Sequence, residues 1–103
     1  MRFAPLVSCL AIACAAPDLE GSCRDFIAAA NACNQDHAAA KGNDPMLLDD
    51  ELCEGDTSEA SNDQLRAGAD RYECKADAFA SADCSTDDGF ESAVAADAAC
   101  DAA

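Results

Sequence analysis

Apolar residues recur at helical spacing in four stretches of this chain. Within residues 22–41, the residues Phe26, Ile27, Ala30 and Cys33 fall on one stripe, which is the pattern of an amphipathic helix. The other three stretches are residues 45–54, 62–83 and 88–101. β-Branched residues are rare and no polar–apolar alternation persists, so we expect no strands. The pattern predicts an all-α fold, a small disulfide-stapled bundle of about four helices that form two helical hairpins.

Short polar residues mark where these helices should begin. Ser22 is expected to cap the first helix. Asp44 and Pro45 suit the cap and the first position of the second helix. Asp87 or Asp88 is expected to cap the last one.

The third stretch has apolar positions on two sides. Leu65, Ala69, Tyr72 and Phe79 form a clear stripe, whereas Cys74 lies about 200° around the helix from Tyr72. A helix with two such faces is expected to have neighbours on both. We therefore predict that this helix is the central one.

The beginning of the chain has the pattern of an export signal. Arg2 is followed by an uncharged stretch to Ala13 that is too short to span a bilayer. The segment from Leu10 to Cys14 resembles a bacterial lipobox, in which the final cysteine receives diacylglycerol and becomes the mature N-terminus. The resemblance implies lipidation of Cys14 and, because Ala15 follows it, sorting to the outer membrane.

Other starts of the mature chain stay open. Cleavage at the A-x-A-like Ala13-Cys14-Ala15 would release a soluble protein, and an apolar N-terminus that is not cleaved is a further alternative. The predicted organisation is a lipoprotein-type signal peptide, a short tether and a single helical, disulfide-rich domain. These parts are residues 1–13, 14–21 and 22–103.

The composition is acidic and poor in large apolar residues. The formal net charge is −15, and all 21 acidic residues follow the apolar leader. Such a chain repels nucleic acid and anionic lipid surfaces, so we expect no nucleic-acid partner. Small domains with a thin core usually need cross-links, and cysteines can supply them here.

Six cysteines remain once the leader is removed and Cys14 is set aside for lipid. An even number in a small exported chain predicts three disulfides. The six are Cys23, Cys33, Cys53, Cys74, Cys84 and Cys100.

The predicted hairpins favour one pairing. Cys33 and Cys53 are each about ten residues from the turn at Asn43, so two antiparallel helices would bring them level. Cys74 and Cys100 are likewise nearly equidistant from Asp87, where the turn of the second hairpin is expected. This leaves Cys23–Cys84 to join the two hairpins.

Two C-x9-C pairs, Cys23 with Cys33 and Cys74 with Cys84, resemble the coiled-coil-helix-coiled-coil-helix proteins. That resemblance is limited to spacing and implies the pairs Cys23–Cys84 and Cys33–Cys74. The repeated spacing, each time followed by a third cysteine, also raises the hypothesis of an internal duplication.

Residues capable of catalysis or metal binding are sparse. His37 is the only histidine, and no nucleophile or second base is placed beside it in the sequence. We expect it on the surface or at the edge of the core. Residues 83–89 carry alternating acidic and hydroxyl side chains, but the EF-hand pattern would need glycine at Asp88 and glutamate at Val94. We predict no catalytic residue, no metal site and no cofactor.

The whole chain resembles the small, acidic, alanine-rich and cysteine-rich lipoproteins that some bacteria encode in numbers. The resemblance rests on the Leu10–Cys14 segment, the short tether and the cysteines on alanine-rich helices. It implies a lipid-anchored envelope protein but no shared activity. We expect a non-enzymatic structural or protein-interaction module, attached to the membrane only through its N-terminal lipid and bound to an unidentified protein. The alternatives are a freely secreted effector, signal or inhibitor, and a weak binder of cations or small ligands.

Overall fold

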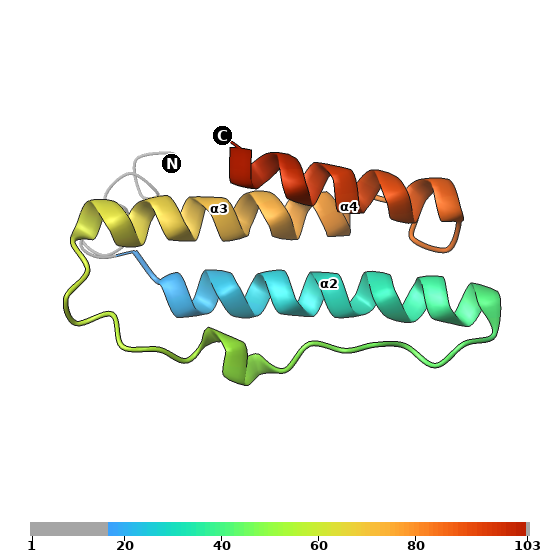
Figure 1. Ribbon diagram of the computed structural model, residues 1–103, viewed down its shortest axis with the longest axis horizontal. Helices are drawn as coiled ribbons and strands as arrows, with labels where there is room; N and C mark the ends of the chain where they lie inside the picture. The colour runs from blue at the N-terminus through green and yellow to red at the C-terminus, as the bar shows by residue number, and fades with distance from the viewer. Residues whose placement is uncertain (1–16, 103) are drawn as a thin grey trace, which may run out of the picture.

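Residues 17–102 are described by a computed structural model, and they form an all-helical fold (Figure 1). Three α-helices are present in this part of the chain, where about four were expected. They are α2 (Leu19–Lys41), α3 (Asn62–Ala80) and α4 (Asp87–Ala102), with a single 3-10 turn, η2 (Asp50–Cys53). Helices α2 and α3 run in the same direction, α4 returns along α3, and the chain between α2 and α3 returns along α2 (Figure 1). No helix among these residues is both long and apolar enough to cross a bilayer.

Helix α2 begins three residues earlier than predicted because Asp18, not Ser22, caps it. The Asp18 carboxylate accepts a hydrogen bond from the Gly21 N–H at 2.9 Å. Residues 19–21, predicted to belong to the tether, are therefore the first turn of the helix. Gly42 ends it with φ of 73°, a conformation that glycine adopts without steric cost.

The prediction of a helix over residues 45–54 is wrong. Outside η2 this segment is not helical, although Asp44 and Pro45 suit a helix start. So short a helix is stable only when it buries an apolar face, and this segment's large apolar side chains are exposed. The segment instead lies along α2, with η2 capped by the Asp49 carboxylate.

The start of α4 also differs from expectation. Thr86 caps it instead of Asp87 or Asp88, since the Thr86 hydroxyl accepts a hydrogen bond from the Gly89 N–H at 3.0 Å. The Phe90 N–H donates to the Thr86 carbonyl at 2.9 Å. Asp87 is thereby left free to contact α2.

All six cysteines of the domain form disulfides, but only one bond joins the predicted partners. The observed pairs are Cys23–Cys53, Cys33–Cys84 and Cys74–Cys100, with Cα–Cα distances of 5.6, 5.1 and 5.9 Å. The predicted Cys74–Cys100 pair is confirmed. The predicted Cys33–Cys53 and Cys23–Cys84 pairs are wrong, as is the Cys33–Cys74 pair implied by the twin C-x9-C resemblance.

Chain geometry explains the first error. An extended chain advances about 3.3 Å per residue, roughly twice the 1.5 Å of a helix. Cys53 lies about ten residues beyond the turn at Asn43, so an extended return brings it level with a helical residue about twenty positions before the turn. That residue is Cys23, not Cys33.

The register of α2 against α3 explains the second error. Because the helices are parallel, residues about 51 positions apart face each other, as Ser22 and Glu73 do through a hydrogen bond. Cys33 and Cys84 are 51 positions apart and become neighbours. In an antiparallel pair of helices, as in the family with twin C-x9-C spacing, Cys23 would instead face Cys84 and Cys33 would face Cys74.

The core is built mainly of small residues. Apart from Ile27, the buried apolar residues are alanines and cysteines: Cys23, Ala30, Cys33, Ala38, Ala69, Cys84, Ala93 and Cys100. Phe26 of α2 extends this core toward α3, with ring centroids 5.7 Å from Tyr72 and 6.0 Å from Phe79. So little apolar area makes the disulfides a large part of the stability.

Helix α3 is the central helix, as predicted. Its Tyr72 and Phe79 face α2, while the Cys74–Cys100 disulfide joins its other side to α4. Lys75 adds polar contacts to α4, 2.9 Å from Asp101 and 3.3 Å from Asp97. Burial alone would lower the pKa of Lys75, but these carboxylates outweigh burial and raise it.

Gly89 allows the turn between α3 and α4 to close tightly, which leads to a testable substitution. A Cβ atom on this residue would lie 1.8 Å from the Asp83 carbonyl oxygen, a backbone atom that cannot move aside alone. Gly89→Ala should therefore lower the free energy of unfolding by about 1 to 3 kcal/mol, despite alanine's better helix propensity. Urea denaturation would measure this. Gly55→Ala, where a Cβ meets open space, is the control; an equal or higher stability of Gly89→Ala would contradict the packing argument.

Candidate functional site

The most unusual surface feature is a run of large apolar side chains on the segment that returns along α2. Met46, Leu47, Leu48 and Leu52, here called the apolar strip, have 83, 52, 39 and 65% of their surface exposed. Large apolar side chains exposed close together on a small domain commonly mark a binding site for another molecule. The only other large apolar residue with comparable exposure among residues 17–102 is Val94 on α4.

Two asparagines of α2 hold the strip in place. Asn31 makes a pair of hydrogen bonds with the Leu48 backbone: its Nδ2 donates to the carbonyl at 3.0 Å and its Oδ1 accepts from the N–H at 2.7 Å. Asn34, one turn further along α2, donates to the Met46 carbonyl at 3.1 Å. These two side chains thus make hydrogen bonds with backbone groups that, in an extended segment, a neighbouring strand would otherwise satisfy.

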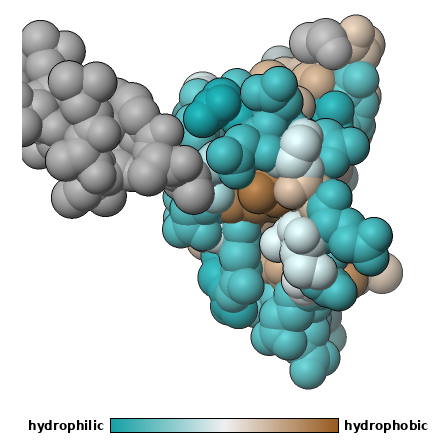
Figure 2. Space-filling view, turned by 90° about the vertical axis from the view of Figure 1, so that its left-hand side faces the viewer, coloured by the Kyte–Doolittle hydropathy of each residue, from teal (hydrophilic) through white to brown (hydrophobic). Residues whose placement is uncertain are grey.

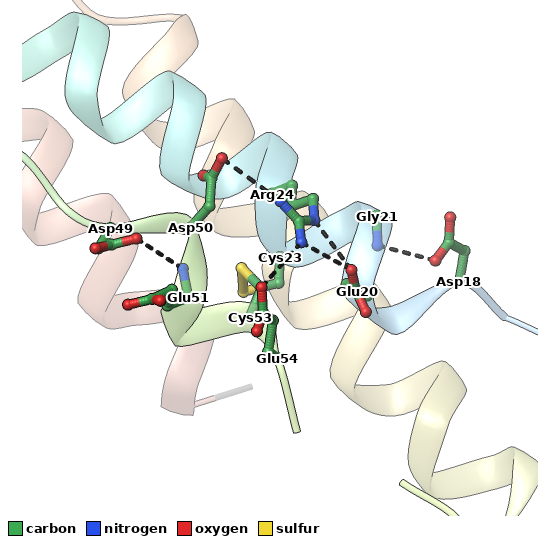
Figure 3. The surroundings of a disulfide bond; sticks show 10 residues. All are labelled: Asp18, Glu20, Gly21, Cys23, Arg24, Asp49, Asp50, Glu51, Cys53 and Glu54. Carbon is green, nitrogen blue, oxygen red and sulfur yellow. Dashed lines mark hydrogen bonds and ion pairs between the residues drawn. A yellow bond between two sulfur atoms is a disulfide. The ribbon is translucent and has the colours of Figure 1, made fainter. Parts of the chain in front are cut away.

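The far end of the strip is fixed covalently and by charge. Cys53 directly follows Leu52 and is bonded to Cys23 of α2 (Figure 3). Beside this disulfide, Arg24 contacts Glu20 at 2.9 Å, Asp50 at 3.5 Å and Glu54 at 3.7 Å. The Arg24 cation therefore joins the first turn of α2 to the beginning and the end of η2. The segment that carries the strip is thus attached to α2 at both of its ends.

A hollow adjoins the strip at the end of the molecule where α2 and α3 begin. It has a volume of about 350 Å³, and its apolar lining includes Leu19, Leu52, Leu65 and Tyr72. Figure 2 shows apolar surface in the middle of this end, bordered by hydrophilic residues. Leu52 belongs both to the strip and to the lining of this hollow.

His37 lies at the edge of the core, on α2 facing the start of α4. Its Nε2 is 2.9 Å from an Asp87 carboxylate oxygen, and its ring stacks on Phe90 with centroids 4.0 Å apart. Lys41 is 2.9 Å from the same carboxylate. These groups lower the pKa of Asp87, mainly through the hydrogen bond with His37 and then through Lys41. The cluster links α2 to α4.

The acidic loop at residues 83–89 does not bring its carboxylates together. Asp83 accepts hydrogen bonds from the N–H and hydroxyl of Ser85, which lower its pKa, while Asp87 turns toward α2. Within residues 17–102, no three His, Cys, Asp or Glu side chains are grouped so that they could hold a metal ion.

Of the other predicted site residues, the six paired cysteines are accounted for above, and Cys14 lies outside the described residues. The apolar strip was not predicted from the sequence, because residues 45–54 were expected to form a helix. The run Met46-Leu47-Leu48 was a possible signal, because three consecutive apolar residues cannot all face one side of a short helix.

Comparisons of the chain with protein-family models, with curated proteins and with solved structures find no match.

The role of Asn31 can be tested by hydrogen exchange. Asn31→Ala removes both bonds to Leu48, so the Leu48 amide should exchange nearly as fast as in an unstructured peptide. The free energy of unfolding should fall by about 1 kcal/mol. Gln35→Ala, one turn along the exposed side of α2, is the matched control. Equal protection of Leu48 in both variants would show that something else holds the strip.

The contact between α2 and α4 should depend on pH through Asp87. Its folded-state pKa is lowered, so the stability it contributes is complete above the unfolded pKa of about 3.9 and is lost as pH falls through the folded value. Asp87→Asn should therefore melt at a lower temperature than the wild type at pH 7, and this difference should shrink as the pH falls below about 3.9 toward 2. Thermal melts across this range would measure it, with the exposed neighbour Asp88→Asn as control. A pH-independent difference would rule out ionisation of Asp87 as the cause.

Proposed function

We propose that this chain is a non-enzymatic envelope lipoprotein whose helical domain acts as a protein-interaction module. In this proposal the chain is exported, is anchored in the outer membrane by acyl groups on Cys14 and has no other contact with the membrane. Its partner is a protein and not a nucleic acid. The domain needs no cofactor, and the proposal assigns no catalytic residue to it.

The observation that carries the proposal is an apolar strip whose side chains are exposed although its backbone is tied to α2. Exposed leucine and methionine side chains bring no burial energy to the isolated domain. Even so, Asn31, Asn34 and the Cys23–Cys53 disulfide tie the backbone of the strip to α2. A surface ordered before binding loses less entropy when a partner docks.

Export is supported by the disulfides together with the leader. All three bonds are of a kind that persists in oxidising compartments such as the periplasm or the extracellular space. The leader with its lipobox-like segment ending at Cys14 supports the same address. Several acyl chains on one cysteine would give a durable anchor, since each buried CH₂ adds roughly 0.8 kcal/mol.

Intact mass of the mature protein from a bacterial host tests the anchor. We expect a chain that starts at Cys14 with a diacyl or triacyl adduct, and reduction should add one hydrogen to each of six cysteines. Cys14→Ser should lose the adduct and keep the three disulfides. A wild-type chain without an adduct that starts near Ala16 or Pro17 would contradict anchoring and favour the freely secreted effector, signal or inhibitor.

A further inference from the structure

The apolar strip lies among negative charges that are not neutralised. Asp44 precedes it, and Asp49 and Glu51 lie within its span; none of the three forms an ion pair with another residue of the described range 17–102. Asp50 must share Arg24 with Glu20 and Glu54. A partner with positive charge would therefore meet carboxylates that the domain itself leaves uncompensated.

The shape of the surface suits a long cationic side chain. A shallow hollow of about 420 Å³ lies beside α2 and is lined by Asn31, Leu47, Leu48, Asp49 and Asp50. Lysine and arginine place their aliphatic stems on apolar surface and extend the charged head to an anion. Leucine and carboxylate side chains beside each other offer both contacts within one hollow. Charge-assisted hydrogen bonds to such carboxylates are stronger than neutral ones.

We propose that the apolar strip is a docking surface for a cationic amphipathic segment of a partner protein. This inference rests on the proposed interaction function and adds the chemistry of the partner. The partner's apolar side chains contact Met46, Leu47 and Leu52, while its lysines or arginines contact Asp49 and the neighbouring acids.

Charge selects this occupant over the other candidates. A second copy of the chain would bring the same net charge of −15 to the interface and would be repelled. An anionic lipid surface would be repelled for the same reason. An apolar partner without cations would leave the acidic border of the strip uncompensated, and a cationic partner without apolar groups would leave the strip exposed to water.

Three peptides test the proposal on the mature, oxidised protein. The probe is an amphipathic peptide of leucine and lysine, about 15 residues long and carrying a fluorophore; in the controls, glutamate replaces lysine or serine replaces leucine. Fluorescence anisotropy should detect binding of the leucine–lysine peptide only. Raising the salt concentration from about 0.05 to 0.5 M should weaken it several-fold, because the charges are exposed to solvent.

Matched variants locate the binding surface. Leu47→Ser should weaken binding about tenfold, a change equivalent to about 1.4 kcal/mol. Its control is Val94→Ser, an exposed apolar residue on α4. This helix is separated by α3 and α2 from the segment that carries the strip (Figure 1). Asp49→Asn, which can still cap η2 through its side-chain oxygen, should weaken binding about threefold. Its control is the exposed Asp70→Asn on α3, and both controls should bind as the wild type does.

Several results would overturn the proposal. Equal binding of the serine–lysine peptide would mean attraction by charge alone, and unchanged binding by Leu47→Ser would place the contact elsewhere. If the protein self-associates and Leu47→Ser abolishes this, the occupant of the strip is a second copy of the chain. If the protein binds zwitterionic phosphatidylcholine vesicles, the occupant is lipid. An acylated mature chain that binds none of the peptides would overturn the cationic partner but not the envelope lipoprotein. An unacylated chain that binds the leucine–lysine peptide as predicted would overturn the envelope lipoprotein but not the cationic partner.

Discussion

The fold depends on the covalent bond between Cys33 in the middle of α2 and Cys84 just beyond the end of α3. The buried residues around it are mainly alanines and cysteines, so the apolar area that holds the helices together is small. The bond closes a loop of 51 residues, which in the entropic model contributes about 4 kcal/mol to stability. It fits the parallel arrangement of α2 and α3, whose register brings Cys33 level with Cys84. The other elements are arranged around this pair of helices.

The disulfides follow the same plan in both halves of the domain. In each half, residues 23–53 and 74–100, the first cysteine is bonded to the third, while the second cysteines join the halves. In each half a helix is followed by a segment that returns antiparallel to it (Figure 1). This symmetry agrees with the hypothesis of duplication, although the returning segment is helical only in the second half. In the first half it is largely non-helical, and its apolar residues therefore face solvent instead of a core.

Local sequence patterns were sufficient for the three long helices and for the central place of α3. They also gave the Cys74–Cys100 pair, because both arms of that hairpin are helical and equal residue counts mean equal lengths. They failed at residues 45–54, where capping signals at Asp44 and Pro45 favoured a helix that has nothing to pack against. That one error changed the length of the returning arm and so produced the wrong partner for Cys33. Lipidation of Cys14 and the partner of the domain depend on molecules beyond this chain, and they stay predictions.

The parallel arrangement and its disulfides are tested most directly by mapping the bonds in the oxidised protein. Proteolysis without reduction, followed by mass spectrometry, can place each of the six paired cysteines on its own stretch of sequence. Trypsin cuts after Arg24, Lys41, Arg66, Arg71 and Lys75, and a glutamate-specific protease cuts after Glu91. We expect the peptide with Cys33 to be linked to the peptide with Cys84, and the peptide with Cys23 to the peptide with Cys53. A link between Cys33 and Cys53 would contradict this expectation, because an extended return from the turn at Asn43 carries Cys53 past Cys33 to the level of Cys23.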